Sequence, residues 1–231
     1  MPHLDQLKNV FRVITYSRRY NYPNNNGYKE GTPFNPMTEA RDLERLINGI
    51  GVDKFHLIGH SYGGLIAIAY ANKHQDKLKS LIVSEPPMLN IEGCAESLRI
   101  TNERLIEKVG AAFKTNDSTL VMKSIFEFFV GKDIQNDIPT EALNTLKANL
   151  IDMKALLNSE NPFPNFNTEF DLPVMIFTSE HTMPILRCTN EILIGNMPNA
   201  KYVHISDSTH DMWMSQPEIM SNHVRSFISQ Q

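Results

Sequence analysis

The sequence lacks the features that would place the chain in a membrane or on nucleic acid. None of its apolar runs reaches the roughly 18–20 residues that a helix needs to cross a bilayer. The first residues do not combine a charged segment with an apolar one, as a signal peptide does. The net charge is −4, and Lys and Arg form no cluster of the kind that phosphate binding requires. We therefore expect neither a membrane nor a nucleic acid as a partner.

Cysteine is scarce as well. The chain has two cysteines, Cys94 and Cys188, which lie far apart and have no neighbours at metal-ligand spacing. Such a pattern does not suggest a disulfide framework, and it predicts no bound metal. It favours a reducing, cytoplasmic location, where thiols stay unpaired.

Short apolar runs rich in Val, Ile and Phe alternate with helical patterns along the 231 residues. This alternation predicts an α/β protein with a mainly parallel sheet flanked by helices. Strands are expected at Phe11–Thr15, Lys54–Ile58, Ser80–Val83, Val174–Phe177 and Tyr202–Ile205. Helices are expected between and after them, at Pro36–Asn48, Gly64–Lys73, Pro184–Asn196 and Pro217–Ser229.

Residues 87–172 depart from this alternation and show helical patterns only. The helices are expected at Ala95–Phe113, Ser118–Val130 and Thr140–Leu157, with several Phe residues for bulk. We interpret the segment as a helical lid subdomain, and residues 1–86 and 173–231 as the core. A helical subdomain with its own small core and no further role fits the same pattern.

The most informative motif is the G-x-S-x-G sequence Gly59-His60-Ser61-Tyr62-Gly63. An expected strand precedes it and an apolar helix follows it, which is the setting of a nucleophile elbow. The glycines suit this reading because the tight turn leaves no room for side chains two residues from the Ser. Ser61 is the candidate nucleophile, and the backbone N–H of Tyr62 is a candidate oxyanion donor. The neighbouring His60 is expected to be structural and to point elsewhere.

A serine nucleophile needs a general base, which an elbow of this kind places late in the chain, after the last strand. His210 follows the expected strand Tyr202–Ile205 and precedes the final helix. It is therefore the candidate base.

With these motifs the chain resembles the α/β-hydrolase superfamily of esterases, meta-cleavage hydrolases and haloalkane dehalogenases over its whole length. The resemblance implies an acid that orients the base, usually in the turn after the lid. Thr182 stands at that position, and Thr cannot carry a negative charge. Two carboxylates are candidates instead: Glu85, at the end of an expected strand where some family members place their acid, and Glu180, two residues before Thr182. We favour Glu85, with Glu180 as the alternative acid.

The resemblance also implies strands before the first one expected here, including one whose His-Gly loop supplies the second oxyanion donor. No His-Gly occurs before Phe11–Thr15. We therefore expect the N-terminal strands to be missing and Met1 to be an internal methionine of a longer reading frame. The gap would leave Phe11–Thr15 to pair directly with Lys54–Ile58, or a partner to fill it.

The sequence thus predicts a serine hydrolase that forms an acyl-serine on a small, largely apolar ester or a related acyl or C–C substrate. No cofactor or metal is expected, and the oligomeric state is not predicted. A Ser at the elbow argues against dehalogenase chemistry, which needs a carboxylate nucleophile. The alternative is a non-catalytic or impaired truncated hydrolase that acts at most as a ligand-binding remnant, since half of the oxyanion hole would be absent.

Overall fold

The computed structural model describes residues 2–24, 27–159 and 163–231, and the chain divides into two compact units. Unit 1 comprises residues 1–15, 40–94 and 163–231, and unit 2 comprises residues 16–39 and 95–162. Residues 160–162 of the expected lid lie outside the described part of the chain.

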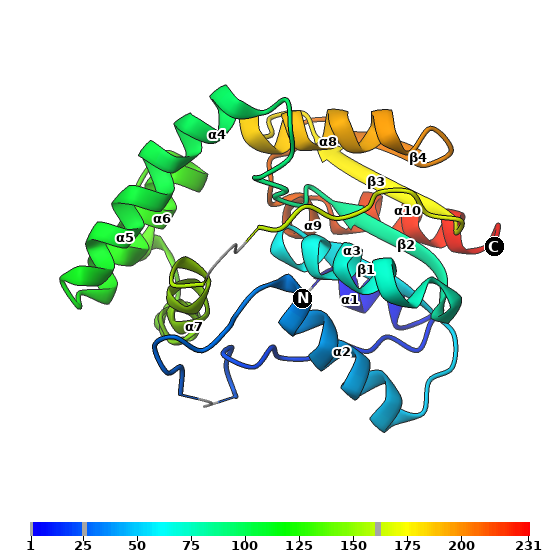
Figure 1. Ribbon diagram of the computed structural model, residues 1–231, viewed down its shortest axis with the longest axis horizontal. Coiled ribbons are helices and arrows are strands. Elements are labelled where there is room, and N and C mark those ends of the chain that lie inside the picture. The colour runs from blue at the N-terminus through cyan, green and yellow to red at the C-terminus, as the bar shows by residue number, and fades with distance from the viewer. Residues whose placement is uncertain (1, 25–26, 160–162) are drawn as a thin grey trace. The chain divides into compact units, whose positions relative to one another are not determined.

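Unit 1 is built on a parallel sheet of four strands in the order β1-β2-β3-β4 (Figure 1). The strands are β1 (Phe55–His60), β2 (Leu78–Ser84), β3 (Val174–Ser179) and β4 (Lys201–Ile205). Because all four run in the same direction, their carboxyl ends meet at one edge of the sheet, which is where ligand sites form in open α/β sheets.

Helices cover both faces of this sheet. One face packs on α2 (Pro36–Ile50), α3 (Tyr62–His74) and α8 (Pro184–Asn196). The other face packs on α1 (Pro2–Leu7), α9 (Met212–Ser215) and α10 (Pro217–Ile228). The central strand β3 shows why both faces are covered: all six of its residues are buried. Strands buried on both sides read as continuous apolar runs, which explains why they could be recognised in the sequence.

Unit 2 is helical between residues 95 and 157. Its helices are α4 (Ala95–Thr101), α5 (Glu107–Lys114), α6 (Ser118–Val130) and α7 (Thr140–Leu157), with the π-helical segment η2 (Asn102–Ile106) between α4 and α5. Val109, Val121 and Leu150 belong to its separate small core. Nowhere in the described parts of the chain is a helix both long and apolar enough to cross a membrane.

Most of the expected elements are present, but the first strand is not. Residues 11–15 form no strand, so the prediction for Phe11–Thr15 is wrong. Phe11 and Val13 are instead partly buried against the core between the sheet and α1, α9 and α10, while Ile14 is exposed. Strand propensity is realised only when a neighbouring strand offers its backbone, and here the alternating apolar residues pack without a ladder. Direct pairing of this segment with β1 is therefore excluded, and β1 is an edge strand of the described sheet.

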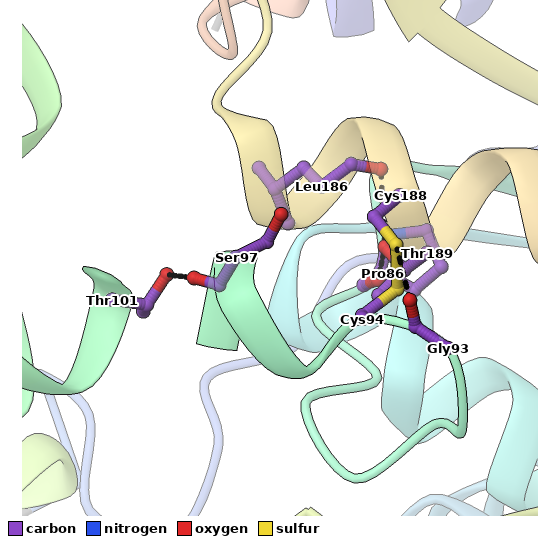
Figure 2. The surroundings of a disulfide bond; sticks show 8 residues. All are labelled: Pro86, Gly93, Cys94, Ser97, Thr101, Leu186, Cys188 and Thr189. Carbon is purple, nitrogen blue, oxygen red and sulfur yellow. Dashed lines mark hydrogen bonds between the residues drawn. A yellow bond between two sulfur atoms is a disulfide. The ribbon is translucent and has the colours of Figure 1, made fainter. Parts of the chain in front are cut away.

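The expectation of unpaired cysteines is also wrong, because Cys94 and Cys188 form a disulfide (Figure 2). Cys94 lies in the segment after β2, and Cys188 lies on α8, which follows β3. Since β2 and β3 are neighbours in the sheet, the segments that leave them can meet despite the 94 residues between the two cysteines. The bridge joins α8 to the last residue of unit 1 before the chain enters unit 2.

The bridge gives a stability prediction. It closes a loop of 94 residues, and cross-links that close long loops stabilise by restricting the unfolded chain, typically by about 2–4 kcal/mol. The double variant Cys94→Ser/Cys188→Ser is expected to lose free energy of unfolding in that range, measured by urea titration under non-reducing conditions. Thiol titration of the unreduced, unfolded wild type is the control, and two reactive thiols would contradict the bridge.

Candidate active site

The elbow around Ser61 has a conformation that its sequence explains. Ser61 lies between the end of β1 and the start of α3, with φ 52° and ψ −127°. That φ is left-handed, a region that non-glycine residues rarely adopt except where the surrounding structure holds them there. A Cβ on Gly59 would lie 2.3 Å from the carbonyl oxygen of Gly63, so only glycine fits at this position.

The register of the sheet places Glu85 beside this elbow. His60, the last residue of β1, pairs with Ser84, the last residue of β2. The backbone N–H of Ser61 then donates to the carbonyl of Ser84 at 2.8 Å. Glu85 leaves β2 in a left-handed conformation, with φ 47°. Two strained non-glycine residues therefore lie side by side at the carboxyl end of neighbouring strands, as strained residues at functional sites often do.

Glu85 and His210 are brought together by the fold. The Nδ1 atom of His210 lies 2.6 Å from Oε2 of Glu85, whose side chain is fully buried, while that of His210 is 17% exposed. An ionised carboxylate can only accept, so Nδ1 carries the proton and donates. In the neutral ring the other nitrogen, Nε2, is then the one that can accept a proton.

The second oxygen of Glu85 is bound by Ser179 at the end of β3. Oε1 accepts from the Ser179 N–H at 2.8 Å and from the Ser179 hydroxyl at 2.6 Å. Burial alone raises the pKa of Glu85, but the hydrogen bonds from His210 and Ser179 outweigh it and leave the pKa below its usual value. The buried Thr182 hydroxyl acts in the same direction without reaching hydrogen-bond geometry. Glu85 is thus held ionised beside His210.

Glu180, the alternative acid, is engaged elsewhere. Its side chain is exposed, and Oε2 accepts from the backbone N–H of Asp207 at 2.7 Å. Its own N–H donates to the carbonyl of Ile205. The backbone hydrogen bond from Asp207 lowers the pKa of Glu180. Both contacts support the loop that leads from β4 to His210, so Glu180 helps to hold that loop in place.

Three side chains around His210 were not singled out from the sequence as part of a site. The ring centroid of His60 lies 4.6 Å from that of His210, which contradicts the expectation that His60 points away. Nδ1 of His60 lies 3.0 Å from Oγ of Ser84, and the indole N–H of Trp213 donates to the same oxygen at 2.8 Å. The register pair His60–Ser84 and the position of Trp213 just after His210 explain the cluster, but only the folded sheet reveals it.

Tyr62 opens α3 directly after Ser61. Its backbone N–H belongs to the first turn of that helix, where N–H groups point out of the N-terminus and favour negative charge. The arrangement therefore offers a hydroxyl at a strained turn, a carboxylate-held imidazole and a helix N-terminus at one edge of the sheet. Such a set can perform nucleophilic attack on a carbonyl, proton transfer and stabilisation of an oxyanion.

Comparison with protein families and relatives bears on this site. The family model described as "alpha/beta hydrolase fold" matches residues 1–217. A proline iminopeptidase of Saccharolobus solfataricus is 43% identical over 79 residues, which is 34% of this chain and 23% of that protein. That alignment thus spans less than a third of the relative. A RutD protein of Caulobacter segnis is 21% identical, and the alignment covers 98% of this chain and 85% of the length of that protein.

Among solved structures, a thermophilic esterase from Thermogutta terrifontis superposes with a TM-score of 0.69. The match covers 99% of this chain and 84% of that chain, at 21% sequence identity. At this level of identity the superposition establishes a shared fold.

Proposed function

Because the chain belongs to the α/β-hydrolase fold family, we propose that it is a serine hydrolase with Ser61 as nucleophile, His210 as general base and Glu85 as the acid that orients His210. The observation that carries the proposal is the 2.6 Å hydrogen bond between His210 and a buried, ionised Glu85. It is formed beside a strained serine at the edge of the sheet where ligand sites of this architecture lie.

The proposed reaction is acyl transfer through an acyl-serine. Oγ of Ser61 attacks the carbonyl carbon of an ester while Nε2 of His210 takes its proton. The tetrahedral intermediate collapses, and His210 gives the proton to the departing alcohol. Water then attacks the acyl-Ser61 ester, and His210 takes a proton from that water and returns it to Oγ. Glu85 stabilises the imidazolium that forms in each half without itself becoming protonated.

The oxyanion of each tetrahedral intermediate needs donors that are already in place. The Tyr62 N–H at the start of α3 is the donor that the elbow supplies. Removal of one such donor costs about 3–4 kcal/mol in serine hydrolysis, so the number of donors has a large effect on turnover.

The proposed substrates are small, largely apolar acyl compounds. Unit 2 carries the exposed apolar side chains Leu120, Phe129 and Leu146, and we propose that it acts as a lid for such substrates.

The disulfide removes the basis for a cytoplasmic location, because that expectation rested on unpaired cysteines.

A panel of p-nitrophenyl esters from acetate to octanoate tests the substrate class. If the acyl chain is buried in an apolar site, kcat/KM is expected to rise roughly fourfold for each added methylene, since burial of one CH2 contributes about 0.8 kcal/mol. The increase should stop where the site is full. A rate that falls steadily from acetate onward would contradict an apolar acyl site.

The alternative is a chain that binds acyl compounds without turning them over, because the elbow supplies one oxyanion donor. Labelling and turnover measured together distinguish the two functions. Stoichiometric labelling of Ser61 by a fluorophosphonate without turnover of any ester in the panel would favour the impaired form, and turnover would exclude it.

A further inference from the structure

His60 lies beside the proposed base although it is not itself part of the proposed triad. It is the last residue of β1, and its ring is tilted by 38° against that of His210, with 4.6 Å between the centroids. At this separation the two rings are in contact, in a tilted arrangement. His210 is held along its edge by Glu85.

A chain of hydrogen bonds holds His60 in turn. The indole N–H of Trp213 can only donate, so Oγ of Ser84 accepts from it. Oγ of Ser84 also lies 3.0 Å from Nδ1 of His60 and donates to the carbonyl of Gly59 at 3.5 Å. The bond between Nδ1 and Oγ of Ser84 ties the His60 ring to the end of β2.

We propose that His60 is a positioning residue: anchored by Ser84 and Trp213, its ring covers one face of His210 and keeps that ring in the plane from which Nε2 can take the proton of Ser61. The proposal rests on the function proposed above. It assigns no contact with substrate to His60, which acts through His210.

The charge state of His60 suits this role. Burial, and next the neighbouring His210, lower the pKa of His60 to about 3. His60 therefore stays neutral at any pH at which the base works. A neutral ring can lie against the imidazolium that His210 becomes during the reaction, whereas a second cation at this distance would oppose its formation. Covering the ring by a neutral side chain thus orients the base without charge repulsion.

Two substitutions at His60 distinguish the contribution of the ring from that of its hydrogen bond. His60→Ala removes the ring and is expected to lower kcat on the best p-nitrophenyl ester by about 10- to 100-fold with KM unchanged, since small misplacements of a reacting group cost about this much. His60→Phe keeps a neutral ring but loses the hydrogen bond to Ser84, and it is expected to lose clearly less kcat than His60→Ala.

The strand provides a matched control. His56 lies on β1 as well, and its Nδ1 is 2.8 Å from Oγ of Ser80, the register partner in β2. His56→Ala therefore removes the same side chain and the same kind of hydrogen bond away from His210. It is expected to leave kcat and KM unchanged. Equal losses in His60→Ala and His56→Ala, or equal losses in His60→Ala and His60→Phe, would reduce His60 to a structural role.

A second measurement does not depend on activity. In protein labelled with 15N-histidine, the ring protons of His210 should carry a ring-current shift from the facing His60. This shift is expected to persist in His60→Phe and in His56→Ala and to disappear in His60→Ala. If the wild type turns over no ester, the proposed function fails while this measurement still decides the contact. Ring protons of His210 that do not move in His60→Ala would overturn the proposal.

Discussion

Replacing Ser61 with Ala is expected to abolish ester hydrolysis, with a loss in kcat of about 10⁶. Losses of this size follow removal of a serine nucleophile, because the remaining oxyanion donors and binding contacts act without covalent catalysis. The substitution deletes one hydroxyl at the elbow and leaves the sheet and its helices untouched, so the effect should lie in the chemistry. Initial rates on p-nitrophenyl butanoate with purified wild type and Ser61→Ala measure it.

Covalent labelling gives the same test without turnover. A fluorophosphonate should add one phosphonyl group to the wild type and none to Ser61→Ala, as read by intact-protein mass. Ser124→Ala, at a half-buried position of α6 where the hydroxyl donates to its own helix, is the control and should label fully. Equal labelling of Ser61→Ala and the wild type would remove Ser61 from the role of nucleophile.

The regular elements of this fold were largely predictable because most of them are buried on a defined face. β2 and β3 are almost wholly buried, so their apolar runs stand out in the sequence. α6 starts after Asp117, whose side chain accepts from the N–H groups of Thr119 and Leu120, and ends at Gly131 in a left-handed conformation. These are the start and stop signals that a sequence displays.

The errors concern features that depend on a neighbour in space. The residues at 11–15 have strand propensity but no adjacent strand in the described fold, so they pack as an irregular segment. Cys94 and Cys188 meet only because β2 and β3 are adjacent. Neither the missing pairing of residues 11–15 nor the contact of the two cysteines can be inferred from positions along the sequence.

In the candidate site, too, some residues could be identified from the sequence and others only from the fold. The elbow motif and the late histidine identify Ser61 and His210 as candidates. Glu85 became a candidate through the resemblance to the family, because some members place their acid at the end of that strand. Two partners become visible only once the strand register and the path of the last loop are known: Ser179, which binds Glu85, and Trp213, which binds Ser84 next to it. Hydrogen-bonded partners that come from other strands leave no local pattern in the sequence.

Replacing Glu85 with Gln is the second change with a large expected effect, a loss in kcat of about 10⁴, as for an Asp-to-Asn change in a serine-protease triad. The structure gives the reason. Oε1 of Glu85 accepts two hydrogen bonds from Ser179. The amide oxygen of Gln therefore occupies the position of Oε1, where it can accept both. The amide NH2 then faces Nδ1 of His210 and donates to it. His210 must place its own proton on Nε2, and the lone pair that should accept the proton of Ser61 is lost.

Glu180→Gln is the matched control because it makes the same chemical change at the other candidate acid. The Glu180 carboxylate accepts one backbone hydrogen bond, from Asp207, and the amide oxygen of Gln can still accept it. Since the side chain is also exposed, kcat is expected to stay within about threefold of the wild type, as surface changes away from the site usually do little. Steady-state rates on p-nitrophenyl butanoate, measured side by side with thermal melts of both variants, compare the two positions. A far larger loss in Glu180→Gln than in Glu85→Gln, with both variants folded, would transfer the role of the acid to Glu180.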